Sequence, residues 1–390
     1  MKWNVIAVAA TIAGGALLFF TDRAEAFTLA TRLLPIFVFV IGMSVVVNIA
    51  AKVQAFEAIT AGLQTMAPAA GAARQRVLWT GLIVLSIIST VFLSLDTTAI
   101  LITPLAVAVA RRNHLHLIAV ALAVVWIANI ASLPLPVSNL TNLLALNGPA
   151  FSSTFDYARQ AFVPAISAIL VALAASWLVN RRRRRDTLDI VTEPHQQLDP
   201  DPLRVIALTI LAVLLPLLAS PIPYWISSSA AAALLLMASL VLRKNLVSIE
   251  LVPWQSLLLA TVFSTVATAA NSLGGAELVI SLLGDFEQTA TGLFGLAWAG
   301  AALSNLINNI PAFLALEPAV HSATGYLALL IGTNAGPIIT PWASLATLLW
   351  HDQLARAGII IKWRTYMLAG SGLIVFALML PLTALVIQGV

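Results

Sequence analysis

Two apolar segments carry polar side chains and helix-breaking residues, and through these residues the chain could bind a solute or an ion. The second segment, 331–349, reads IGTNAGPIITPWASLATLL, with two prolines, two glycines, an asparagine and several small hydroxyl residues. Proline removes a backbone donor and glycine loosens a helix. In lipid, a broken backbone survives only where protein or a water-filled cavity surrounds it. The segment therefore indicates a site near the middle of a membrane.

The first segment, 128–144, has the same pattern 205 positions earlier and reads ANIASLPLPVSNLTNLL. Asn129 corresponds to Asn334, and Pro136 corresponds to Pro341. The shared order of asparagine, proline and polar cluster indicates an internal repeat. Asn129 and Asn334 could coordinate an ion or could repair the backbone beside the prolines. The candidate binding residues in the two segments are Asn129, Ser138, Asn139, Asn142, Asn334, Ser344 and Thr347.

Two carboxylates are predicted within the apolar part of the chain, and either could carry a proton. Asp96, followed by Thr97, lies between the apolar runs 75–94 and 99–110. It can serve as a proton or cation site, as the cap of the helix that follows, or as both. Glu317, in LALEPAV, could replace a missing carboxylate as proton carrier, or could lie near the membrane surface in contact with water.

Composition places the chain among polytopic membrane proteins. Of its 390 residues, 60% are hydrophobic and 9% are charged, whereas soluble domains carry about 25% charged residues. There is no cysteine, which excludes disulfides and thiolate metal sites. Neither a phosphate-binding glycine loop nor a His-Glu-x-x-His motif is present, and no nucleophile–base set is visible. We therefore expect no enzyme activity, cofactor or metal, and the net charge of +4 does not indicate nucleic acid.

Basic residues between the apolar runs predict the topology, because positive loops stay cytoplasmic. Arginines flank residues 75–112, so this block is predicted to be a re-entrant hairpin with short arms and Asp96 at its tip. A second hairpin, about 289–322, is predicted to enter from outside. In it, Asn308 and Asn309 are expected to form the turn and cap the second arm. Further spans are predicted at 1–20, 30–51, 160–179, 203–219, 225–242, 254–272 and 366–387.

Together these features predict an all-α membrane protein with two inverted repeats, each containing a hairpin and a broken transmembrane helix. The broken helices, about 117–146 and 325–350, would run in opposite directions. The repeats would cover 1–180 and 202–390, joined by a cytoplasmic linker, 181–201, that opens with five arginines. Ala24-Glu25-Ala26 resembles a signal-peptidase site, but a retained first helix with a cytoplasmic N-terminus is favoured.

Four motifs, at 94–104, 131–142, 304–312 and 336–350, resemble the arsenite efflux permeases of the ion-transporter superfamily. They read SLDTTAILITP, ASLPLPVSNLTN, SNLINNIPA and GPIITPWASLATLLW. The superfamily includes dicarboxylate and sulfate carriers and sodium/proton antiporters. The resemblance implies an elevator mechanism, in which the hairpins and broken helices move against a scaffold of the other spans. Carried over by position, Asp96 and Asn309 mark the hairpin tips.

The sequence also departs from the permeases. The permeases carry an aspartate before A-S-L-P, another before G-P and a lysine after it, where this chain has Asn129, Asn334 and Ile338. A charge inside a membrane costs about 2.5–3.5 kcal/mol on insertion scales and is kept mainly for function. These neutral residues leave the coupling ion and the solute open. No cation is predicted in the site, which disfavours a highly charged anion.

The favoured function is secondary transport in a bacterial inner membrane, with proton-coupled export of arsenite, antimonite or a similar oxyacid. The alternative is a carrier of the same fold for another anion or for Na⁺/H⁺ exchange, and a remote alternative is a membrane scaffold without transport. Membrane lipids and a coupling ion, H⁺ or Na⁺, are expected partners, and a homodimer and a soluble ATPase partner stay open. The histidines are expected at the surface or in loops, namely His114, His116, His195, His321 and His351.

Overall fold

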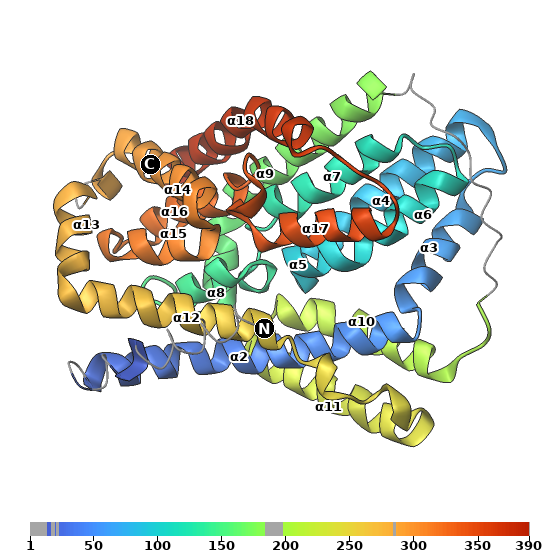
Figure 1. The fold of residues 1–390 in the computed structure, drawn as a ribbon, viewed down its shortest axis with the longest axis horizontal. Coiled ribbons are helices and arrows are strands. Elements are labelled where there is room, and N and C mark those ends of the chain that lie inside the picture. Colours follow the sequence, from blue (N-terminus) through green and yellow to red (C-terminus); the bar gives the residue numbers. More distant parts are fainter. Residues whose placement is uncertain (1–13, 17–19, 21–22, 184–197, 284–285, 390) are drawn as a thin grey trace.

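The computed structural model describes residues 14–16, 20, 23–183, 198–283 and 286–389, and every regular element in this part of the chain is a helix (Figure 1). Seven described helices are long and apolar enough to cross a membrane. This confirms the predicted all-helical membrane fold. Most of the predicted first span, most of the linker and His195 lie outside the described residues. The seven candidate spans are Arg23–Lys52, Gly71–Leu93, Thr154–Arg181, Tyr224–Leu242, Trp254–Gln288, Ala290–Ile307 and Trp363–Gly389.

The helices form two layers (Figure 1). The lower layer in this view contains α2 (Arg23–Lys52), α10 (Pro202–Leu218), α11 (Tyr224–Leu242) and α12 (Trp254–Ala270). Within it, α2 packs most extensively against α11, and α10 also packs on α11. The hairpins, the broken helices and the two long helices α9 (Thr154–Arg183) and α18 (Trp363–Gly389) form the upper layer.

Each hairpin reverses direction at a single residue with positive φ. In the first, α4 (Gly71–Leu93) ends at Ser94, which has φ 110° and ψ 159°. In the second, α14 (Ala290–Ile307) ends at Asn308, which has φ 96° and ψ 154°. The side chain of each caps the arm that follows, and Asn308 does so as predicted. The following arms are α5 (Leu95–Thr97), η1 (Thr98–Ile102) and α6 (Thr103–Arg112) in the first, and α15 (Asn309–Leu316) and η7 (Glu317–Ala319) in the second.

Two details of the first hairpin differ from the prediction. The chain reverses at Ser94 rather than at Asp96, because Ser94 is the residue with a positive φ at this turn. The first arm is also longer than predicted. Helix α4 has 23 residues and begins at Gly71, four residues before the predicted block.

The two broken helices are interrupted at corresponding positions of the repeat. Helix α7 (Leu117–Ile130) resumes as α8 (Leu140–Leu146), and α16 (Ala323–Ala335) resumes as α17 (Leu345–Arg356). The ends of α7 and α16, and the starts of α8 and α17, are each 205 residues apart, as the sequence repeat is. Prolines and glycines in the interruptions remove backbone donors or loosen the helix, so neither helix continues. Each interruption contains one short 3₁₀ turn, η2 (Pro136–Ser138) or η8 (Pro341–Ala343).

The sequence did not predict several short helices, because none is long enough to read as a span. Helix α3 (Ala55–Met66) follows α2 and contacts both α10 and α6. Helix α13 (Ala276–Leu283) follows α12 and contacts η7. The remaining short turns are η3 (Lys244–Leu246), η4 (Ile249–Leu251), η5 (Asn271–Gly275) and η6 (Phe286–Gln288).

Two histidines expected in surface loops lie elsewhere. His116 is 9% exposed, and its Nδ1 caps α7 by accepting from Ala119 N at 3.1 Å. His351 lies within α17 and stacks on Trp363 with ring centroids 4.0 Å apart. Both side chains therefore have structural contacts that explain their presence, whereas His114 and His321 are exposed.

Candidate functional site

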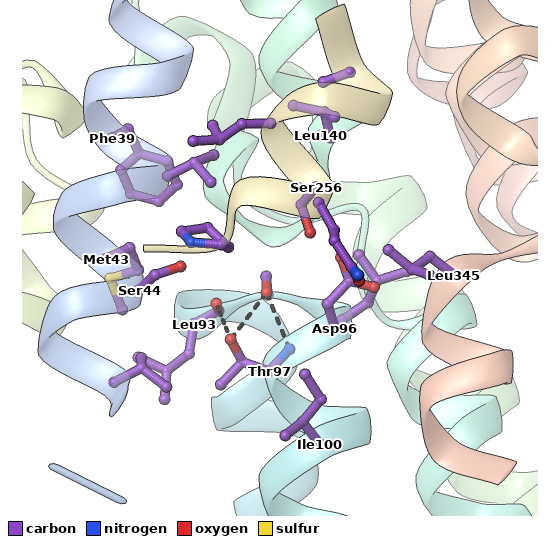
Figure 2. Close-up of a pocket in the computed structure, with 18 of the residues that line it drawn as sticks. Phe39, Met43, Ser44, Leu93, Asp96, Thr97, Ile100, Leu140, Ser256 and Leu345 are labelled. Carbon is purple, nitrogen blue, oxygen red and sulfur yellow. Dashed lines mark hydrogen bonds between the residues drawn. The ribbon is translucent and has the colours of Figure 1, made fainter. Parts of the chain in front are cut away.

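A cavity of about 490 Å³ lies between the two layers. Helices α2 and α12 line it from the lower layer, and the tip of the first hairpin, α8 and α17 line it from the upper layer (Figure 2). Most of its wall is apolar. The residues labelled in Figure 2 are Phe39, Met43, Ser44, Leu93, Asp96, Thr97, Ile100, Leu140, Ser256 and Leu345.

Asp96 is the one charged side chain among the described residues that line this cavity. The predicted capping role of Asp96 is wrong, because Ser94 Oγ accepts from Thr97 N at 3.2 Å and thereby caps this turn. Thr97 Oγ1 donates to Leu93 O at 2.9 Å. Within the described part of the chain, the Asp96 carboxylate has no hydrogen bond or ion pair. It is therefore available to a solute or a proton.

The asparagines of the broken helices form a separate polar core, which the cavity does not reach. Asn334 Oδ1 accepts from Asn139 Nδ2 at 2.9 Å and from Thr141 Oγ1 at 2.8 Å. Asn334 Nδ2 donates to Asn142 Oδ1 at 2.7 Å. Asn142 in turn donates to two carbonyls of the interruption, Ser132 O at 2.7 Å and Leu135 O at 3.0 Å. These amides satisfy each other and the unwound backbone, as buried polar groups must.

Asn129, which corresponds to Asn334 in the repeat, has fewer hydrogen bonds. Its Nδ2 donates to Val125 O at 2.9 Å and lies 3.5 Å from Thr347 Oγ1. Its Oδ1 is buried and has no hydrogen-bond partner among the described residues, and the same holds for Ser344 Oγ. The reason follows from the repeat. Ser344 stands where the first segment has Asn139, and its Oγ makes no hydrogen bond to Asn129; Ala346 stands where the first segment has Thr141, and its side chain carries no donor.

The two asparagines should therefore differ in their effect on stability. Asn334→Ala removes one side chain and leaves three buried partners unsatisfied, which we expect to cost about 3 kcal/mol. Asn129→Ala removes one good hydrogen bond and an already unpaired oxygen, with an expected cost of about 1 kcal/mol. Thermal unfolding of the purified protein in detergent measures both. Equal losses in the two variants would contradict this account of the polar core.

The second hairpin is tied to the interruption beside it. Asn308 Nδ2 donates to Trp342 O at 2.9 Å. Asn305, which the sequence reasoning did not single out, donates to Gly336 O at 2.9 Å and accepts from Thr340 N at 2.9 Å. The sequence feature that could have identified Asn305 is a polar amide within an otherwise apolar helix. Asn309 is only 4% exposed and lies at the start of α15.

The predicted site residues thus fall into four groups, one of which is the pair Asn308 and Asn309 at the turn of the second hairpin. Asp96 and Thr97 line the cavity. The polar residues of the broken helices are buried outside it, including Ser138, whose Oγ donates to Val91 O at 2.8 Å. Glu317 forms the last group, because it lies at the end of the second hairpin and forms an ion pair with Arg32. Asp96 is therefore the predicted carboxylate that lines the cavity.

Comparison with known proteins relates the chain to membrane transporters. Residues 1–347 match the citrate transporter family. The arsenical pump membrane protein of Yersinia enterocolitica is 29% identical over 344 residues, covering 82% of this chain and 79% of that protein. Its counterpart in Escherichia coli is 28% identical over 341 residues with the same coverage. A putative arsenical pump membrane protein of Bacillus subtilis (strain 168) is 28% identical over 146 residues, which is 34% of this chain and 32% of that protein.

Proposed function

The chain belongs to the citrate transporter family of membrane transport proteins, and within it we propose that this protein exchanges a small uncharged oxyacid for protons. The observation that carries the proposal is the Asp96 carboxylate, which lies in the cavity between the layers without a partner among the described residues. A carboxylate in this position can bind a proton and release it again. Its charge also repels anions, so it favours a solute without negative charge.

Arsenous and antimonous acids fit this description, because both are neutral hydroxylated molecules at neutral pH. The polar groups of the cavity wall, such as Ser44, Thr97 and Ser256, can donate to or accept from hydroxyl groups. The relatives named as arsenical pump membrane proteins support the same solute class. Export in exchange for entering protons would follow the gradient across a bacterial inner membrane.

The two layers support an elevator mechanism for this transport. The lower layer would be the scaffold, and the hairpins and broken helices would move against it. The equal spacing of the interruptions supports two inverted repeats, over about 1–180 and 202–390. In this topology the N-terminus and the linker 181–201 face the cytoplasm. The cavity lies between the proposed moving and fixed parts, where a carried solute would be enclosed.

An anion such as a carboxylate is the second candidate, which the family match favours. Free N–H groups at helix starts near the hairpin tips could hold one negative charge. Against it, the described lining residues include no arginine, lysine or histidine to balance several charges. A multiply charged anion would therefore meet Asp96 without compensation.

A transport assay in everted membrane vesicles separates the two candidates. When the vesicle interior is acidic, so that protons leave as the solute enters, we expect arsenite and antimonite to accumulate and citrate not to accumulate. Dissipating the gradient with a protonophore should abolish the accumulation. Accumulation of citrate alone, with the protein confirmed in the membrane, would exclude the uncharged solute and support the second candidate.

A further inference from the structure

Arg32 is a charged residue within the 30-residue helix α2 that no motif of the sequence singles out. Charges inside a membrane are rare, and they commonly face a protein partner and serve function. The Arg32 side chain is 19% exposed, so most of it is enclosed by protein. Its partners therefore indicate what it does.

Arg32 binds both carboxylate oxygens of Glu317. Its Nη1 donates to Oε2 at 3.1 Å, and its Nη2 donates to Oε1. Nη2 also donates to Leu144 O, at 2.6 Å, in the last turn of α8. Tyr326 OH also donates to Glu317 Oε1, at 3.2 Å. Such bidentate pairs between ionised groups are the stronger kind of hydrogen bond.

This ion pair joins the two layers. Arg32 belongs to the lower layer, whereas Glu317, Leu144 and Tyr326 belong to η7, α8 and α16 of the upper layer. A second polar contact crosses at the same place, because Asn147 Nδ2, just after α8, donates to Tyr224 OH of α11 at 2.7 Å. Both of these contacts between the layers therefore lie at the C-terminal end of α8.

The cavity lies toward the other end of α8. Leu140, the first residue of this helix, and Leu143 line it together with Asp96. Helix α8 therefore has hydrogen bonds to the lower layer near its C-terminal end, and its first residue lines the cavity that separates it from that layer. A movement of the upper layer against α2 would change the cavity and would have to separate Arg32 from Glu317.

We propose that Arg32 and Glu317 form a latch that holds the two layers in this arrangement and opens during transport. The inference rests on the proposed function, since the layers need to move only if the protein carries a solute. Removing one partner leaves the other charge buried without compensation, which strongly disfavours the latched arrangement. The Arg32–Glu317 pair thereby determines the population of this arrangement of the layers relative to any other arrangement.

Electron–electron distance measurements with spin labels test the latch directly, because the chain has no cysteine of its own. Labels at Ile222→Cys and His321→Cys report on the two layers, since both positions are exposed, one in the lower layer and one in the upper. Without further change we expect one dominant distance. Glu317→Gln, which keeps the shape of the side chain, should increase the ratio of a second distance at least about tenfold.

Three further variants complete the test. The exchange Arg32→Glu with Glu317→Arg should return the distribution toward one distance. Arg32→Lys, which keeps the charge without the paired hydrogen bonds, should give an intermediate ratio and serves as a milder second variant. Asp352→Asn is the matched control, because it removes an exposed Arg356–Asp352 pair within one helix and should change nothing.

A folded Glu317→Gln protein with the original distance distribution would overturn the latch. The readout does not depend on which solute is carried. Failure to transport arsenite together with a responsive latch would therefore count against the proposed solute and leave the latch standing. Normal arsenite transport with an unresponsive distribution would overturn the latch alone.

Discussion

Asp96→Asn is expected to abolish proton-driven movement of arsenite while leaving the protein folded. Asparagine has nearly the shape of aspartate but cannot take up or release a proton in this pH range. The Asp96 carboxylate has no hydrogen bond or ion pair among the described residues, so little structure depends on its charge. Without a group that binds and releases a proton in the cavity, accumulation driven by the gradient should fall to the level of vesicles without the protein. Uptake into vesicles, with and without a proton gradient, measures this loss.

The conservative variant Asp96→Glu is the matched control for this position. It keeps a group that can carry a proton, and we expect it to retain part of the gradient-driven transport. Thermal unfolding should differ little among the three proteins. Full gradient-driven transport by Asp96→Asn would show that another group carries the proton.

Gly370→Ala is expected to prevent stable folding. Gly370 lies in α18, where a methyl group would overlap the backbone oxygen of Ile338 in the second interruption. That oxygen belongs to unwound backbone, which survives in a membrane only when protein encloses it. Overpacking against backbone cannot be relieved by a side-chain rotation, so we expect a loss of more than about 4 kcal/mol. The yield of monodisperse protein after solubilisation, and its unfolding temperature, measure the effect.

Gly372→Ala provides a control in the same helix. No atom lies within 4 Å of a methyl group added at Gly372. Alanine also has the better helix propensity, by about 1 kcal/mol. We therefore expect this variant to be at least as stable as the original protein. If Gly370→Ala unfolds within a few degrees of Gly372→Ala, the close approach of α18 to the interruption is not essential.

The positions of the interruptions could be predicted from the sequence because their cause is local. Proline and glycine act on their own backbone. The helix interruptions in the segments 128–144 and 331–349 therefore do not depend on how the rest of the chain packs. The ends of α7 and α16 differ by the same 205 residues as the sequence repeat. The hairpin turns were placed within two residues, because a polar residue at a helix start is also a local signal.

The division of the polar residues into a cavity and a sealed core could not be predicted in this way. Asp96 and Asn334 both lie in apolar segments, and the sequence does not say which faces a cavity. Arg32 and Glu317 are 285 positions apart, and Asn305 contacts an interruption 31 to 37 positions later. Such pairs depend on how whole helices pack. The sequence does identify Arg32 as a charge within an apolar helix, which is the signal that could have led to the latch.

Coupling of an uncharged oxyacid to a proton in the Asp96 cavity is tested most directly by measuring proton entry during arsenite efflux from proteoliposomes. Vesicles loaded with arsenite, with equal pH inside and outside, are diluted into arsenite-free buffer while a dye reports the internal pH. We expect the interior to acidify as arsenite leaves, and Asp96→Asn to show no acidification. Arsenite efflux without proton entry, or acidification unchanged by Asp96→Asn, would contradict the account.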